Sequence, residues 1–257
     1  MSKRPEEQPV KVLGLVQARM SSTRLPGKVL MKIGPWTALE WTVRRLKMAN
    51  VVDEVVVATT TNKADRVIVE MCREKGWPVH CGSEEDVLGR TLEAATAFSP
   101  RIIVDVTSDC PFADPRHVDL LVAAILRHGA DYASNIEPRS WPDGFDVQAY
   151  KMAALIKLSE DPRSNREHSG WNATQFRELR RWSYSAPKPC WHPSWRLTLD
   201  TAADLDTLRG VWERYVNRTA HNELFSAPEL IKWIASHKEV MVNREVDSTT
   251  PGVRSGK

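Results

Sequence analysis

The most constraining feature of the sequence is an alternation of short apolar runs with longer amphipathic stretches. Runs rich in β-branched and apolar residues, which predict strands, occupy residues 10–16, 51–59, 78–81, 102–106 and 131–135. Stretches typical of helices lie between them, at 36–48, 64–75, 83–98 and 115–127. This alternation predicts an α/β fold with a mixed, mainly parallel sheet flanked by helices.

The second half of the chain departs from this pattern. The stretch 141–195 lacks clean alternation and is rich in tryptophan and basic residues. We interpret it as an arm or subdomain inserted into the core, which is expected to resume with a strand at 196–200. Further helix-like segments occur at 151–158, 171–179, 204–215 and 228–236.

Length and composition indicate one domain with a substantial core. The chain has 257 residues, of which 42% are hydrophobic. We expect the domain to span 10–244, between a disordered lead-in at 1–9 and a disordered tail at 245–257. The formal net charge of +3 argues against a general nucleic-acid surface.

Hydropathy and cysteine usage predict a cytoplasmic protein that does not enter a membrane. Residues 1–9 are polar and lack the apolar core of a signal peptide, and no run approaches the roughly 18 apolar residues of a membrane span. Without C-x-x-C spacing, the cysteines are expected to be reduced thiols rather than zinc ligands or a disulfide framework. They are Cys72, Cys81, Cys110 and Cys190.

A basic loop at 17–30 follows the first predicted strand. It carries Arg19, Arg24 and Lys28, with hydroxyl side chains between them and a Pro-Gly bend before the lysine. Ligands of open α/β sheets bind beyond the carboxyl ends of strands, so the loop predicts a cradle for a polyanion such as a triphosphate. It has neither the spacing of a P-loop nor a G-x-G-x-x-G fingerprint. A merely solvated loop is the alternative, which the buried strand and the hydroxyls disfavour.

Carboxylates at the ends of other predicted strands are expected to face the basic loop. Asp109 and Asp200 each follow an apolar run, where they would face the same crevice and hold Mg²⁺ together with phosphate oxygens. Each could instead form a turn or cap a helix. Asp146 is a candidate contact for a second substrate, and His168 could position an acceptor, whereas Asp143 in a Pro-Asp-Gly turn reads as structural.

The basic loop, the carboxylates and several polar turns form an ordered series of short blocks between residues 11 and 215. The blocks are Ala18-Arg-Met-Ser-Ser-Thr-Arg-Leu-Pro-Gly-Lys28, Val57-Ala-Thr-Thr-Thr-Asn62, Gly82-Ser-Glu-Glu-Asp-Val-Leu88, Thr107-Ser-Asp-Cys-Pro111, Pro142-Asp-Gly-Phe-Asp146, Arg166-Glu-His168 and Leu199-Asp-Thr201. In this order they resemble the cytidylyltransferase family, which includes the CMP-Kdo and CMP-acylneuraminate synthetases. The branch they most resemble is that of spore coat polysaccharide biosynthesis protein F.

The resemblance implies a nucleotide-diphospho-sugar transferase-like fold and transfer of CMP from CTP to a small acidic acceptor, with Mg²⁺-assisted in-line displacement of pyrophosphate. It implies catalytic roles for Arg19 and Lys28 and metal binding by Asp109 and Asp200. Related enzymes are often homodimers, so a homodimer is expected. The implied substrate-binding residues are Ala18, Arg24, Thr59, Thr60, Ser83, Ser108, Asp146, Arg166, His168 and Lys188, among which Thr59, Thr60 and Ser83 fall where the fold recognises base and ribose.

The acceptor stays open at this stage, because the stretch 169–195 departs from the resembled branch. Its cations would suit a compact charged acceptor, so a sugar acid and a small phosphonate are both candidates. These residues are Arg177, Arg180, Arg181, Lys188 and His192.

Two other functions compete with the cytidylyltransferase hypothesis. A nucleotide-sugar-dependent glycosyltransferase of similar fold would need an Asp-x-Asp metal motif, which Ser108-Asp109-Cys110 does not supply. A nucleic-acid-binding module would use the interleaved aromatic and arginine side chains of 171–195. The near-neutral charge and the paired carboxylates argue against it.

Overall fold

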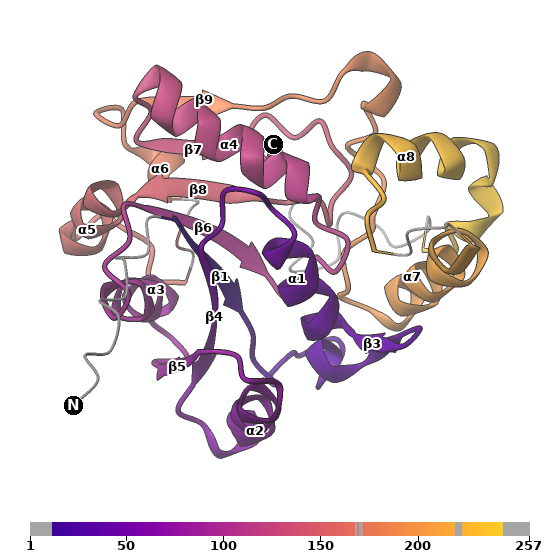
Figure 1. Ribbon diagram of the computed structural model, residues 1–257, viewed down its shortest axis with the longest axis horizontal. Helices are drawn as coiled ribbons and strands as arrows, with labels where there is room; N and C mark the ends of the chain where they lie inside the picture. Colours follow the sequence, from indigo (N-terminus) through magenta and orange to yellow (C-terminus); the bar gives the residue numbers. More distant parts are fainter. Residues whose placement is uncertain (1–11, 168, 170–171, 219–222, 244–257) are drawn as a thin grey trace, which may run out of the picture.

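The computed structural model describes residues 12–167, 169, 172–218 and 223–243. These residues form a seven-stranded sheet in the order β5-β4-β1-β6-β8-β7-β9 (Figure 1). Only β8 runs antiparallel to its neighbours in this sheet, so all the other strands point the same way. The strands are β1 (Val12–Gln17), β4 (Glu54–Thr60), β5 (Val79–Gly82), β6 (Ile102–Thr107), β7 (Tyr132–Ser134), β8 (Gln148–Lys151) and β9 (Arg181–Ser183). A separate small hairpin pairs β2 (Lys32–Ile33) with β3 (Trp36–Thr37).

Helices cover both faces of this sheet. The face packed against α1 (Ala38–Lys47), α2 (Arg66–Lys75) and α4 (Pro115–His128) takes alternate strand residues such as Val12 and Val16. The other face takes Leu13 and Leu15 and packs against α3 (Val87–Thr96), α5 (Met152–Glu160) and α6 (Asn172–Gln175). Because both faces are buried, the central strands read as continuous apolar runs in the sequence.

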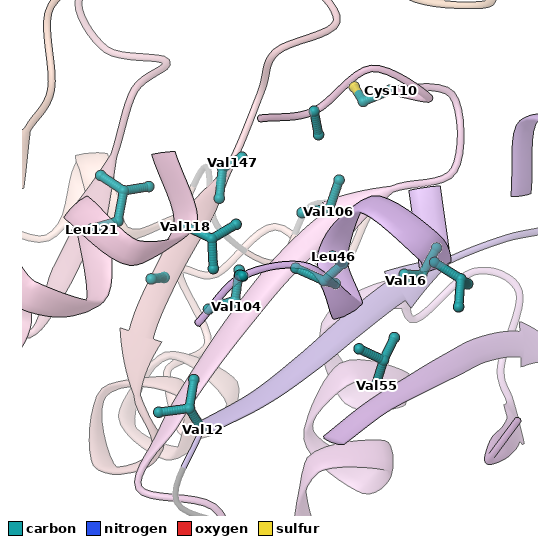
Figure 2. Close-up of a cluster of buried hydrophobic side chains, with 14 of the residues drawn as sticks. Val12, Val16, Leu46, Val55, Val104, Val106, Cys110, Val118, Leu121 and Val147 are labelled. Atoms are coloured by element: carbon teal, nitrogen blue, oxygen red, sulfur yellow. The ribbon is translucent and has the colours of Figure 1, made fainter. Parts of the chain in front are cut away.

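The core under α1 and α4 is built mainly from valines. Figure 2 shows these side chains converging from the strands and from the two helices. Labelled among them are Val12, Val16, Val55, Val104, Val106 and Val147 from the sheet and its flanks, Leu46 from α1, and Val118 and Leu121 from α4.

The helix starts follow from local chemistry. Thr37 caps α1 by accepting a hydrogen bond from the Glu40 amide, and the Thr37 amide in turn donates to the Glu40 carboxylate, which satisfies two donors at the helix start. Asp114 caps α4, whose first residue is Pro115, a position where the missing amide hydrogen costs nothing. These caps fix where the chain leaves the strand ends and enters the covering helices.

A further core cluster joins α7 (Ala202–Arg214) and α8 (Ala227–Ser236) to the stretch 141–195, at one side of the sheet (Figure 1). Trp141 and Phe145 are buried there with Cys190. The same stretch supplies β8 and β9 to the main sheet. The interpretation of this stretch as an inserted arm stays a prediction.

The predicted fold class is confirmed by this architecture, but several local predictions were wrong. Residues 196–200 form no strand; they make only an isolated bridge between Asp143 and Arg196. The helix expected at 83–98 is α3, which begins only at Val87 and is capped by Asp86, and the Ser83 hydroxyl accepts a hydrogen bond from the Asp86 amide. The lead-in at 1–9 and the tail at 245–257 lie outside the described residues.

Candidate active site

The basic loop is closed by backbone hydrogen bonds. Gly27 has φ 71°, a left-handed conformation that glycine adopts without a steric penalty, and its amide donates to the Met20 carbonyl over 3.0 Å. The Met20 amide donates to Asp65 Oδ1 over 2.6 Å. The short 3₁₀ helix η1 (Lys28–Leu30) then begins directly after Gly27. The bend predicted from the Pro-Gly pair thus places Lys28 at a defined point beyond the end of β1.

Lys28 lies between the two carboxylates that the sequence singled out. Its Nζ is 2.9 Å from Asp109 Oδ2 and 2.8 Å from Asp200 Oδ1. The Lys28 side chain is only 13% exposed. Burial by itself lowers the pKa of Lys28, but the charges of Asp109 and Asp200 outweigh this effect and raise the pKa above its ordinary value. The lysine is therefore a fixed cation at neutral pH.

Arg24 forms an ion pair with Asp200, one of the two carboxylates that Lys28 contacts. Its Nη2 is 2.9 Å from Asp200 Oδ1, whereas its Nη1 is buried and has no hydrogen-bond partner among the described residues. An unsatisfied buried donor costs about 1–3 kcal/mol, so it is expected to meet an acceptor when ligand is bound. Arg24 thus presents a free donor beside the lysine–carboxylate cluster.

Arg196 binds the second oxygen of Asp200. The sequence analysis did not predict Arg196 as a site residue. Its guanidinium lies 3.2 Å from Asp200 Oδ2, 3.2 Å from Asp143 Oδ2 and 3.1 Å from Asp204 Oδ2. Only 8% of Arg196 is exposed. The available signal was the spacing of Arg196 and Asp200, four residues apart, which we interpreted as part of a strand.

Backbone contacts bring the segments of Asp109 and Asp200 together. The Leu199 amide donates to the Asp109 carbonyl over 2.8 Å. The Leu197 amide donates to the Asp143 carbonyl over 2.6 Å. Gly144 has φ 109°, and a Cβ there would lie 2.3 Å from the Leu197 carbonyl carbon. The close approach of the two segments therefore requires glycine at this position.

Asp146 is held in a second ion pair. Arg139 donates to both Asp146 oxygens, over 3.0 and 2.7 Å, and lies 3.5 Å from Asp143. Burial, followed by the charge of Asp146, raises the pKa of Asp143 to about 6. Arg139 was also missed by sequence reasoning, because a single arginine in a loop carries no spacing signal. Asp143, interpreted as a turn residue, is in fact part of this charged network.

Glu84 joins the basic loop to the turns after β4 and β5. It accepts hydrogen bonds from Ser21 and Asn62, and Arg19 lies 3.7 Å away. The hydrogen bond from Ser21 contributes most to lowering the pKa of Glu84. Glu84 lies in the block 82–88 of the sequence but was not predicted as a site residue.

The residues expected to recognise base and ribose lie at the same edge of the sheet as the basic loop. The Thr59 hydroxyl is buried and has no partner among the described residues, and Thr60 hydrogen-bonds to Asp65. Ser83 follows β5 directly. Because β4 and β5 are parallel neighbours of β1, these residues and the basic loop share one edge of the sheet.

The remaining predicted site residues are placed as follows. Ala18 extends β1 with an amide hydrogen bond to Ala58, and the Ser108 amide donates to Gln17. Arg166 pairs with Asp86 at the start of α3. Lys188 is exposed on the 3₁₀ helix η3 (Lys188–Cys190), which packs against α8, and it forms no ion pair with the described carboxylates. His168 lies outside the described residues.

Within the described ranges, no three or more His, Cys, Asp or Glu side chains gather as a group that could hold a metal ion. None of the helices in those ranges has the length and apolar character needed to cross a membrane. The cysteines there are free thiols, and burial raises the pKa of Cys110 well above its ordinary value.

The chain has a mainly parallel sheet, with a cation-rich loop and two aspartates at its carboxyl edge. This arrangement is that of a nucleotidyltransferase. Comparison with known proteins gives the family. Residues 13–175 match the Cytidylyltransferase family. The chain is 30% identical to spore coat polysaccharide biosynthesis protein SpsF of Bacillus subtilis over 241 residues, which cover 92% of this chain and 99% of the relative. The chain belongs to the cytidylyltransferase family.

Solved structures agree with this assignment. A cytidylyltransferase from Leptospira borgpetersenii is similar with a TM-score of 0.83 and 31% identity, over 91% of this chain and 98% of that one. A CMP:2-keto-3-deoxy-manno-octonic acid synthetase complexed with CTP shares the fold, with a TM-score of 0.60 and 18% identity, over 79% of this chain and 99% of that one. The predicted family, fold and enzyme class are thus confirmed. The individual site residues stay predictions.

Proposed function

We propose that the chain transfers CMP from CTP to a small acidic acceptor and releases pyrophosphate. The observation that carries the proposal is the meeting of Lys28 with Asp109 and Asp200 at the carboxyl edge of the sheet. The family supports a cytidine nucleotide as the donor, and the relative of similar fold that is complexed with CTP supports the same choice.

The basic loop supplies the charges that a triphosphate requires. Lys28 is a permanent cation, and Arg24 offers a buried donor that lacks a partner in the described part of the chain. Arg19 is 42% exposed on its side chain and lies at the open end of the loop. We assign the three side chains to the phosphate oxygens, with Thr59, Thr60 and Ser83 on the nucleoside side.

The carboxylates fit a divalent cation. Asp109 and Asp200 already direct one oxygen each at the same ammonium group, and carboxylate oxygens are ligands that Mg²⁺ prefers. Two protein carboxylates suffice for Mg²⁺ when phosphate oxygens and water complete its coordination. When bound, Mg²⁺ would neutralise charge on the phosphates and on the departing pyrophosphate.

The reaction we assign is an in-line displacement at the α-phosphorus. A bond forms between the acceptor oxygen and the α-phosphorus, while the bond to the oxygen that bridges the α- and β-phosphates breaks and its electron pair leaves with pyrophosphate. An acceptor hydroxyl would lose its proton to solvent. The chain contributes by orienting the donor and by placing Lys28, Arg19 and Arg24 against the growing negative charge.

The test is a pyrophosphate-release assay with CTP and candidate acids, comparing wild type with Lys28→Met. Removing one preorganised charge of this kind costs about 10²–10³ in rate. Lys32→Met is the matched control, because Lys32 is exposed on β2 and forms no ion pair among the described residues. The control should retain wild-type turnover. Wild-type turnover in Lys28→Met would remove the lysine from the mechanism. The homodimer and the cytoplasmic location stay predictions.

A further inference from the structure

We propose that Arg90 is a positioning residue that holds the turn at 83–86, here called the nucleoside turn, at a fixed separation from the basic loop. The inference rests on the proposed function, which assigns Ser83 to the nucleoside of CTP and the basic loop to its triphosphate. Arg90 lies in α3, is only 2% exposed and contacts both segments. Because Arg90 is buried, its effect on CTP passes through these two segments.

The guanidinium of Arg90 joins two strand ends that do not pair with each other. Its Nη1 donates to the Ser83 carbonyl over 2.5 Å, and its Nε and Nη2 donate to Gln17 Oε1 over 3.2 and 2.9 Å. Gln17 ends β1 and Ser83 follows β5, and each of these strands pairs with β4, which lies between them. Since neighbouring strands are about 4.8 Å apart, β1 and β5 are about 10 Å apart across the sheet. Arg90 supplies the direct link between their ends.

Gly82 leaves room for the stem of Arg90 beside β5. A Cβ at Gly82 would lie 2.9 Å from Arg90 Cγ and 3.1 Å from Arg90 Cβ. Both of these atoms are close to the α3 backbone, so they cannot swing aside as the far end of a long side chain could. A side chain at position 82 would therefore push the arginine out of its place between α3 and the sheet.

Both acceptors of Arg90 are neutral, which separates its role from that of an ion pair. Arg90 forms no ion pair with a described carboxylate. Taking a guanidinium out of water costs free energy that a carboxylate partner would offset directly. Burial, followed by the charge of Arg19, lowers the pKa of Arg90, and more distant carboxylates offset this only in part. The bonds to Gln17 and Ser83 therefore contribute orientation rather than charge balance.

Gln17 connects Arg90 to the phosphate side of the site. Its Nε2 donates to Thr91 Oγ1 over 2.7 Å, so both ends of its side-chain amide are held. Its backbone carbonyl accepts from the Ser108 amide over 2.9 Å, directly before Asp109. Arg19, the first cation of the basic loop, follows Gln17 by two residues. Arg90 thus fixes the segment that carries the phosphate-binding side chains relative to the nucleoside turn.

A ligand that spans both segments depends on their separation, whereas a ligand of one segment does not. CTP must reach the nucleoside turn and the basic loop at once, so its two halves bind with an advantage that depends on geometry. A displacement of about 1 Å can cost about 10²-fold in such an arrangement. Inorganic tripolyphosphate needs only the basic loop, and cytidine needs only the nucleoside turn.

The experiment measures binding of CTP, tripolyphosphate and cytidine to the full chain by calorimetry and ligand-observed NMR, without an acceptor, and melting temperatures in parallel. Arg90→Met keeps an apolar stem but removes every donor. The double variant Gln17→Met/Arg90→Met also replaces the acceptor, so that neither buried partner is left alone and stability is recovered. Arg127→Met is the matched control, because Arg127 is exposed in the last turn of α4, which covers the opposite face of the sheet.

Both Arg90 variants should bind CTP about 10- to 100-fold more weakly than wild type, and should bind tripolyphosphate and cytidine as wild type does. The double variant should melt higher than Arg90→Met and still bind CTP weakly, which separates position from stability. Arg127→Met should match wild type with all three probes.

Unchanged CTP binding in both Arg90 variants would overturn the positioning role. Equal weakening of tripolyphosphate or of cytidine would overturn it as well, because a direct contact with that half of CTP, or a disordered segment, would then explain the loss. Absence of CTP binding by wild type would contradict the proposed function itself, and the inference with it.

Discussion

Arg196→Met is the substitution that most directly tests how the site is held together. The guanidinium makes hydrogen bonds to three aspartates and is almost completely buried. Methionine keeps much of the apolar stem but removes every donor. Asp143, Asp200 and Asp204 then lose a shared cation while staying in place.

The magnitude follows from the burial of Asp204, whose side chain is fully buried and would keep only Asn243, Thr201 and backbone donors. Breaking a buried ion pair by removing one partner costs about 3–5 kcal/mol. For a chain of this size 1 kcal/mol shifts the melting temperature by about 2–4 °C, so the variant should melt roughly 6–20 °C lower.

The loss should depend on pH in a defined direction. Burial tends to raise the pKa of Asp204, but the hydrogen bonds from Arg196, Asn243 and the Asp200 amide, together with the charge of Arg196, outweigh burial and lower the pKa. A lowered carboxyl pKa stabilises the fold above the unfolded pKa of about 3.9, and this stability is lost as the pH falls. The deficit of Arg196→Met should therefore be largest near neutral pH and shrink below about pH 4.

Urea unfolding followed by circular dichroism at pH 7 and at about pH 3, below the unfolded carboxyl pKa, measures both effects. Arg214→Met is the control, because Arg214 forms an exposed pair with Glu239 at 3.4 Å, and such surface pairs contribute less than about 1 kcal/mol. A loss in Arg196→Met no greater than that of the control would refute the idea that the arginine organises the three carboxylates.

Two further predictions concern buried groups around the site. Burial lowers the pKa of His117 to about 4, so its unfolded form binds more protons between pH 6.5 and 4, and the contribution of His117 to wild-type stability should decline by about 3 kcal/mol over that range. Asp143, whose pKa is raised to about 6, contributes with the opposite sign in both proteins, so the comparison is between the slopes of wild type and variant. His117→Gln should flatten this decline in urea titrations; an unchanged slope would assign the decline to other groups. Gly144→Ala should lower the melting temperature more than Gly76→Ala, since both have positive φ but only Gly144 would press a Cβ onto the Leu197 backbone. Equal melting temperatures would refute the required contact.

The part of the fold that the sequence predicted best is the part in which the strands are long and buried on both faces. β1, β4 and β6 are mostly apolar runs, and among the helices between them α1 and α3 begin at side-chain caps. β8 and β9 were not predicted, because both lie in the stretch 141–195 that lacks clean alternation, and β9 is an edge strand of three residues of which two are exposed. Short strands are defined by their partners, which sequence periodicity does not show.

The same distinction applies to the candidate site: residues with a local sequence signal were predicted, and residues placed by tertiary contacts were not. Lys28, Asp109 and Asp200 were identified because each directly follows an apolar run or bend, and the structure brings them into contact. Arg139 and Arg196 were missed because their roles come from tertiary contacts between distant loops. A strand at 196–200 was predicted from its apolar residues. The segment is instead held by single backbone hydrogen bonds to Asp109 and Asp143, without the repeated pairing of a β-sheet.

The most direct test of the central claim follows the α-phosphorus of CTP. Wild-type enzyme, Mg²⁺ and a sugar acid are incubated with CTP labelled at that phosphorus, and the products are separated. The label should appear in the acid conjugate together with cytidine, and one unlabelled pyrophosphate should be released for each conjugate formed. Label in free CMP without a conjugate, or an acid that receives a terminal phosphate instead, would contradict transfer of CMP from CTP.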